Sequence, residues 1–177
     1  MKLQIGVIFI PGPVGSIARM LGLRFSHAFI RYEKPEGWWL MDSGLWRIKD
    51  RPSTGLEKAT DYVILETREP LGPETAQRII DYARGNVGKL YNFWGLIRLG
   101  WRLLRERFGV QALAYPSYIC TDFVVDSFHY GGIDIVPPGQ LLVLPDEIAA
   151  SDKLVEVPVA NNTTTCWGVG PVLRAGE

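Results

Sequence analysis

Cysteine and histidine are scarce in this sequence, which has only two of each among its 177 residues. Two cysteines are too few for the disulfide framework of a small secreted domain. A Cys/His zinc site would use every cysteine and histidine in the chain. We therefore expect a reduced, cytoplasmic protein that carries no metal and no other cofactor.

The sequence also lacks an excess of charge of either sign, since 19 Lys and Arg residues face 19 Asp and Glu residues. A formal net charge of zero gives no overall basic field around the molecule. The composition therefore predicts that nucleic acid is not a partner.

Long apolar runs are missing as well. The most apolar stretch, 90–104, is interrupted by glycines and arginines between residues 95 and 102, whereas a membrane helix needs about 18 uninterrupted apolar residues. Near the N-terminus the run "IGVIFI" is shorter than the apolar core of a signal peptide and is followed by Pro11. We expect a soluble or peripheral protein whose first apolar run is a strand.

The hydrophobic pattern predicts one domain over residues 1–158 and a C-terminal tail over 159–177. The expected strands are 3–10, 25–32, 38–46, 61–69 and 141–144. The expected helices are 14–22, 72–86, 91–108 and 118–132, followed by a short helical turn at 145–151. Ser16 is a candidate cap of the first helix. Because the clearest connection is a hairpin, we expect an α+β fold with a mostly antiparallel sheet.

The expected helix 91–108 combines large apolar side chains with arginines. Trp94, Trp101 and Phe108 recur every seven residues, which places them on one helical stripe. One interpretation is a surface helix packed on the core. The other is a helix that makes a peripheral contact with a membrane or a partner.

The stretch "SYICTDFVVDSFHYGG", 117–132, holds one cysteine and one histidine. His129 follows Cys120 by nine residues in the same expected helix, which turns it to the opposite side and moves it about 13 Å along the axis. His129 therefore cannot serve Cys120 as a base. Cys120 is either a small core residue or a nucleophile at the first turn of a helix, where backbone amides favour a thiolate.

The remaining histidine, His27, lies on an expected strand of the N-terminal hairpin, with Phe25 and Phe29 on its own face if the alternation holds. Two loop lengths at "KPEG" both bring Asp42 to the face of His27, either diagonal to it or directly opposite. An odd loop would place Ser43 there instead. A carboxylate beside a histidine fixes its tautomer, so we expect Asp42 or Ser43 as the orienting residue.

The order of these elements resembles one known family. "FSHAFIRY", "WWLMDSG", "NVGKLYNFWGL", "YICTDFVVDSFHYGG" and "VLPDEIAAS" are similar, in this order, to the segments of the circularly permuted relatives of NlpC-type papain-like hydrolases. That group includes YiiX-like bacterial proteins and the lecithin:retinol acyltransferases. The resemblance covers residues 4–151. The family's usual Cys-Ser-Glu is Cys-Thr-Asp here, and its Tyr-Asp is Tyr-Asn.

The resemblance implies a permuted papain-like fold and a thiol hydrolase. Its catalytic residues would be Cys120 as nucleophile, His27 as base and Asp42 as orienting residue. The candidates for substrate and oxyanion contacts are Tyr91, Ile119 and Thr121.

Several substrates remain open at this point. The partner would be an amide or ester, in a peptide, in peptidoglycan or in a lipid. Lipid substrates would make the chain an esterase or acyltransferase at a membrane surface. A non-enzymatic structural or assembly module that keeps the fold is the third alternative.

Overall fold

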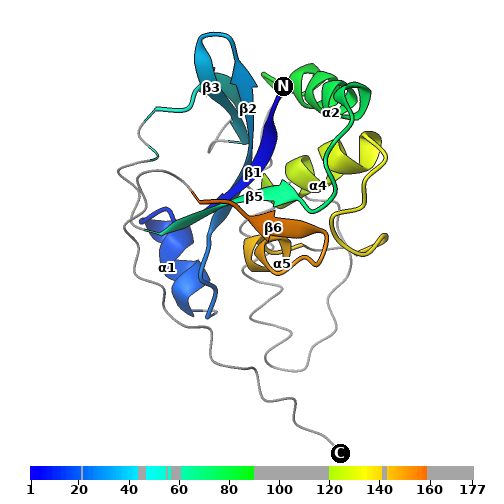
Figure 1. Cartoon of the computed structure of the whole chain (residues 1–177). Coiled ribbons are helices and arrows are strands. Elements are labelled where there is room, and N and C mark those ends of the chain that lie inside the picture. Colours follow the sequence, from blue (N-terminus) through cyan, green and yellow to red (C-terminus); the bar gives the residue numbers. More distant parts are fainter. Residues whose placement is uncertain are drawn as a thin grey trace, which may run out of the picture.

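The protein is described by a computed structural model over residues 1–20, 22–43, 47–54, 56, 61–89, 120–140 and 143–158 (Figure 1). The elements are β1 (Leu3–Ile8), α1 (Pro13–Met20), β2 (His27–Lys34), β3 (Gly37–Ser43), β4 (Ile48–Pro52), β5 (Tyr62–Thr67), α2 (Pro73–Gly85), α4 (Cys120–Tyr130), α5 (Pro145–Ala149) and β6 (Leu154–Glu156). The strands form one sheet in the order β4-β3-β2-β1-β5-β6, and every neighbouring pair is antiparallel. The expected α+β fold with an antiparallel sheet is confirmed.

Helices α2 and α4 lie beside each other on one side of the sheet, and α5 lies near β1 (Figure 1). Pro73 begins α2, where its missing N–H leaves no hydrogen bond unmade. The apolar stripes of both helices face the sheet and fill the main core with residues such as Ile5, Ile30, Ile80 and Phe123. This packing sets the position of the first residue of α4 against β2. None of the described helices is long and apolar enough to cross a membrane.

The β2–β3 hairpin has a two-residue loop, which is one of the two expected loop lengths that bring Asp42 to the face of His27. Lys34 pairs with Gly37, whose φ of +122° is a backbone conformation that favours glycine. In this register Asp42 pairs with Phe29. Asp42 therefore lies diagonal to His27 on the same face of the hairpin.

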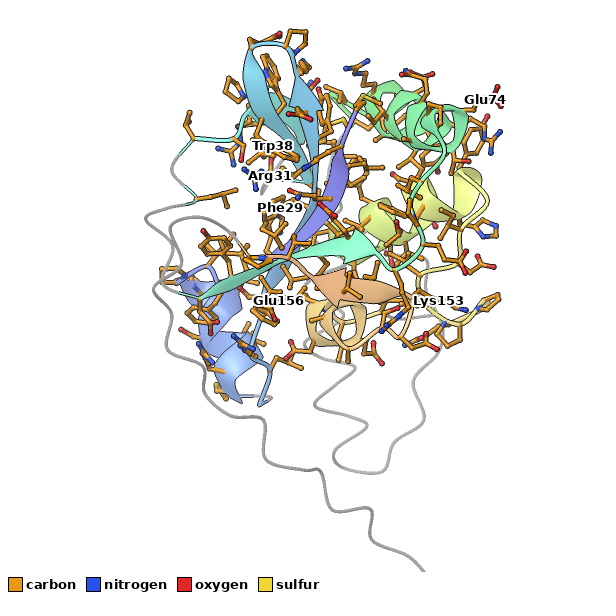
Figure 2. All side chains as sticks on the ribbon, viewed as in Figure 1. Phe29, Arg31, Trp38, Glu74, Lys153 and Glu156 are labelled. Carbon is orange, nitrogen blue, oxygen red and sulfur yellow. The ribbon has the colours of Figure 1, made fainter. Side chains whose placement is uncertain are left out.

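The face of the sheet that carries Phe29 has a smaller core, with Leu40, Tyr62 and Ile64 also buried. The ring of Phe29, labelled in Figure 2, lies over Gly6 of the neighbouring strand. A Cβ at Gly6 would come within 2.0 Å of Phe29 Cζ. Only glycine leaves the ring this space.

We expect Gly6→Ala to lower the free energy of unfolding by about 1–3 kcal/mol, because the added methyl group displaces a buried ring. Urea denaturation measures the change. The control is Gly85→Ala on α2, where a Cβ would meet no atom within 4 Å; it should leave stability unchanged or raise it by up to about 1 kcal/mol. A Gly6→Ala chain as stable as the unchanged chain would contradict the contact.

Three local predictions were wrong. Ser16 is the fourth residue of α1 and not its cap, because the helix already begins at Pro13. Val143 and Leu144 are not in a strand; they lead directly into α5, whose start at Pro145 was expected. Phe25 does not share a face with Phe29, because β2 begins only at His27 and Phe25 packs in the main core.

Two short strands, β4 and β6, were not predicted. Other expectations lie outside the described residues: the helix 91–108, the residues before Cys120 and the tail from residue 159.

Candidate functional site

His27 is the first residue of β2, and the chain just before it is anchored by α5. The carboxylate of Asp146 accepts hydrogen bonds from the backbone N–H of Arg24 at 2.8 Å and of Phe25 at 3.1 Å. Both bonds join segments far apart in the sequence. They fix the backbone that leads into β2 and therefore limit how far the His27 side chain can shift.

The hairpin brings Asp42 to His27. Nε2 of His27 lies 3.7 Å from Oδ2 of Asp42, and the two side chains are 13% and 11% exposed. This contact is an ion pair that is longer than a normal hydrogen bond. Because Nε2 faces Asp42, the other ring nitrogen, Nδ1, is the one left for a further partner.

A third side chain, Arg51 of β4, completes the surroundings of Asp42. Its Nη2 donates a hydrogen bond of 2.9 Å to Oδ2 of Asp42. Burial alone would raise the pKa of Asp42, but the hydrogen-bonding groups and charges of His27 and Arg51 hold it below its usual value. Asp42 is therefore a carboxylate at neutral pH.

Cys120 is the first residue of α4, and it is only 5% exposed. Burial alone would raise the pKa of its thiol. The charge of His27 and a hydrogen bond with it, together with the backbone N–H groups of Ala28 and Thr121, outweigh burial and lower the pKa of Cys120. The structure thus brings Cys120 and His27, which are distant in sequence, close enough for each to shift the pKa of the other.

The imidazole responds in the opposite direction. Burial alone would lower the pKa of His27, but the charge of Cys120 and the hydrogen-bonding groups of Asp42 and Cys120 raise it to about 10. A lowered thiol pKa beside a raised imidazole pKa favours a thiolate–imidazolium pair over a neutral thiol and imidazole. Such a pair can act as a nucleophile and as a proton donor within one site.

The other candidates fall into different places. Thr121 is fully buried and contributes its backbone N–H to Cys120. Tyr91 and Ile119 lie outside the described residues. Ser43, the alternative to Asp42, is buried, and its Oγ has no hydrogen-bond partner among the described residues.

His129 is remote from this pair, as its helical position predicted. Its side chain is 70% exposed, and Nδ1 lies 2.6 Å from Oδ1 of Asp134. The hydrogen bond and charge of Asp134 raise the pKa of His129. The second cysteine, Cys166, lies outside the described residues.

Sequence reasoning missed two contributors to the site. Arg51 belongs to the unpredicted strand β4, where it pairs directly with Leu40, two residues before Asp42 in β3. The only sequence signal for this contact is that a cationic residue follows the hairpin closely enough in sequence to reach Asp42. The N–H group of Ala28 is a backbone contribution, which its residue type does not reveal.

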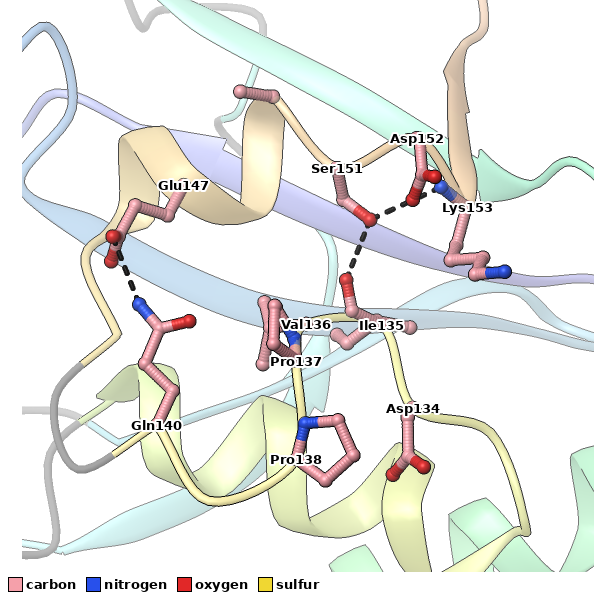
Figure 3. A pocket seen from close by; sticks show the side chains of 11 residues that line it. Asp134, Ile135, Val136, Pro137, Pro138, Gln140, Glu147, Ser151, Asp152 and Lys153 are labelled. Carbon is pink, nitrogen blue, oxygen red and sulfur yellow. Dashed lines mark hydrogen bonds between the residues drawn. The ribbon is translucent and has the colours of Figure 1, made fainter.

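A hollow of about 780 Å³ lies elsewhere, between α5 and the loop that follows α4 (Figure 3). Its lining includes Asp134, Glu147, Asp152 and Lys153, and Gln140 donates a hydrogen bond to Glu147 across it. His27, Asp42 and Cys120 are not part of this lining.

Comparisons with known proteins find a likeness in fold. No protein-family profile matches the sequence, and no curated protein matches it. The crystal structure of the metalloprotein YiiX from Escherichia coli O157:H7 is similar, with a TM-score of 0.66 and 13% sequence identity. The likeness covers 88% of this chain and 94% of the YiiX chain.

Because YiiX is a metalloprotein, we tested whether the residues of this chain would suit a metal ion. The described residues contain no group of three or more His, Cys, Asp or Glu side chains arranged to hold one. Within the candidate site, Oδ2 of Asp42 is already engaged by Arg51 and His27. At 13% identity the likeness concerns the fold alone: an α+β domain with a six-stranded antiparallel sheet, similar to that of YiiX.

Proposed function

We propose that the protein is a cysteine hydrolase of the circularly permuted papain-like type, with Cys120 as nucleophile, His27 as acid and base, and Asp42 as orienting residue. One observation carries the proposal: the buried thiol of Cys120 and the largely buried imidazole of His27 shift each other's pKa in opposite directions. Perturbed pKa values of this kind are concentrated at catalytic sites. The five sequence segments that resemble the family occur in its order.

The residues would support acyl transfer in two steps, acylation of Cys120 and hydrolysis of the thioester. The Cys120 thiolate attacks the carbonyl carbon of an amide or ester, and the backbone N–H groups of Cys120 and a neighbouring residue stabilise the oxyanion. The His27 imidazolium gives its proton to the leaving amine or alcohol as a thioester forms on Sγ. Water then attacks the thioester and transfers a proton to His27, which releases a carboxylic acid and restores the pair.

A thiol-directed acyl probe tests this proposal. We expect one probe molecule to attach to the full chain and peptide mass spectrometry to place it on Cys120. Cys120→Ala should remain folded and lose the label, whereas Cys166→Ala should keep it. A label that survives in Cys120→Ala and disappears in Cys166→Ala would refute the assignment.

The class of substrate is a further part of the proposal. Peptide or peptidoglycan amides suit the NlpC branch of the resemblance, and lipid esters suit the acyltransferase branch. Of the two, we propose amide hydrolysis, with lipid ester hydrolysis as the alternative.

A non-enzymatic module is the alternative that one observation favours. Cys120 is only 5% exposed, and an enzyme must let substrate reach its nucleophile. Failure of both small and large thiol-directed acyl probes to label the folded chain would support this alternative.

A further inference from the structure

Arg31 of β2 is a partly buried cation without a carboxylate partner. Its guanidinium lies over the ring of Trp38, 4.2 Å from the centroid, and Nη1 donates to Oε1 of Gln4 at 3.3 Å. Nε is buried and has no hydrogen-bond partner among the described residues. No described carboxylate lies within ion-pair distance of this guanidinium, whereas Arg19 and Arg24, which also stack on aromatic rings, both form ion pairs with Asp61.

Arg24 offers the comparison. Its guanidinium also lies over an aromatic ring, that of Phe25, at 4.7 Å from the centroid. Unlike Arg31, it forms an ion pair, with Asp61 at 3.2 Å. The fold therefore neutralises Arg24, whereas Arg31 has no counter-charge among the residues that the structure describes.

The guanidinium of Arg31 is held in place before any anion arrives. Glu66 accepts a hydrogen bond of 2.7 Å from Nε2 of Gln4, which turns the amide oxygen of Gln4 toward Arg31. Trp38 supports the flat face of the guanidinium. Burial lowers the pKa of Arg31 and Tyr62 opposes this, but the group stays a cation at neutral pH. A fixed planar cation of this kind suits bidentate binding of a carboxylate or phosphate.

Arg31 also lies on the same face of the hairpin as His27 and Asp42 of the candidate site. It pairs with Leu40, while the next residue on that face, Phe29, pairs with Asp42. Side chains on one face of a strand recur about every 7 Å, so Arg31 is roughly 13 Å along β2 from His27. Figure 2 shows Trp38, Arg31 and Phe29 following one another beside the sheet.

We propose that Arg31, supported by Trp38, binds a carboxylate or phosphate group of the molecule whose carbonyl Cys120 attacks. The proposal rests on the proposed function and adds that the substrate is an anionic acyl compound. Two acidic residues lie on neighbouring positions of the sheet: Glu33, which pairs with Trp38 across the hairpin, and Glu66, which is bound to Gln4. Neither forms an ion pair with Arg31, so the guanidinium is available to an anion from outside.

Binding can be measured without the reaction. We would titrate suberate and, separately, inorganic phosphate into the full chain carrying Cys120→Ser and follow the heat by calorimetry. Arg31→Met keeps the apolar contact with Trp38 and removes the charge, and should weaken binding by about 10- to 100-fold. Arg24→Met is the matched control and should leave it unchanged.

Comparing the two anions shows whether Arg31 binds a carboxylate or a phosphate group. Tighter binding of suberate assigns the subsite to a carboxylate, and tighter binding of phosphate assigns it to a phosphoryl group. No binding of either anion, or binding that Arg31→Met and Arg24→Met weaken equally, would overturn the proposal.

A matched pair of esters connects the subsite to the reaction. The mono-p-nitrophenyl ester of suberic acid carries a free carboxylate, and its methyl-capped counterpart does not. Arg31→Met should lower kcat/KM for the acid about 10- to 100-fold and leave the neutral ester unchanged. An equal loss for both esters would overturn the proposal. If the unchanged chain hydrolyses neither ester, the proposed function fails, while the calorimetry still decides whether Arg31 binds anions.

Discussion

A His27→Gln chain should react with iodoacetamide at Cys120 at least about 100-fold more slowly than the unchanged chain at pH 6. Glutamine keeps much of the size and polarity of histidine but carries no positive charge. Burial then acts on the thiol without the opposing charge of His27, so the pKa of Cys120 rises to its usual value or above. A thiol with a pKa of about 8.5 is only roughly 0.3% thiolate at pH 6.

The pH dependence gives the sign of this effect. In the unchanged chain the pKa of Cys120 is lowered, so the alkylation rate should fall less steeply between pH 8 and pH 6 than it does in His27→Gln. In His27→Gln the rate should fall about tenfold for each pH unit over that range. Mass spectrometry measures both rates in a Cys166→Ala background, which leaves Cys120 as the only cysteine.

His129→Gln is the matched control, because this histidine is exposed and paired with Asp134. In this variant Cys120 should be alkylated at the same rate as in the unchanged chain. Circular dichroism should show that both variants are folded. If His27→Gln retains fast alkylation at pH 6, the thiolate–imidazolium pair does not exist.

An Asp42→Asn chain should lose turnover by about 10²–10⁴-fold on an activated ester. The carboxylate of Asp42 is one cause of the raised pKa of His27, and an amide lacks that charge. An asparagine can also present an N–H group to Nε2, which favours the wrong tautomer of His27. The loss should appear mainly in kcat, because Asp42 is buried and acts through its ion pair with His27.

The pH profile of kcat checks the mechanism of that loss. His27 in the unchanged chain loses its proton near pH 10, because its pKa is raised to about 10. Removing the Asp42 charge lowers this pKa, so the alkaline limb of kcat should move to lower pH. Ser43→Ala is the control: it should leave turnover and the alkaline limb unchanged. A larger loss in Ser43→Ala than in Asp42→Asn would make Ser43 the orienting residue.

Much of the part of the site that lies on the hairpin, His27 and Asp42, could be predicted from local sequence. Pro35 and Gly37 mark the turn, and the alternation of the strands brings His27 and Asp42 to one face for either even loop. The turn residues alone do not distinguish the two-residue loop from the four-residue loop, because Pro35 and Glu36 belong to both. The choice depends on how β2 and β3 pair with the rest of the sheet, which involves residues far from the turn.

The remaining parts of the site depend on contacts without a local pattern. Strand β4 has one buried residue, Ile48, and is otherwise formed by charged residues and Pro52, as is usual at a sheet edge. It shows no alternation of apolar and polar residues, so Arg51 could not be placed beside Asp42. The contact of Cys120 with His27 could be inferred only from the family resemblance, because it is made by the packing of α4 on β2.

The separation of the two half-sites along the chain also affects folding. The His27–Asp42 half is a hairpin, which needs only local contacts to form. Cys120 joins it late in the chain, through long-range packing that is slow to form. Until α4 docks, Cys120 is an ordinary thiol that is mostly protonated at neutral pH. Its reactivity therefore begins only when the core is complete, so a nascent or partly unfolded chain does not carry an activated nucleophile.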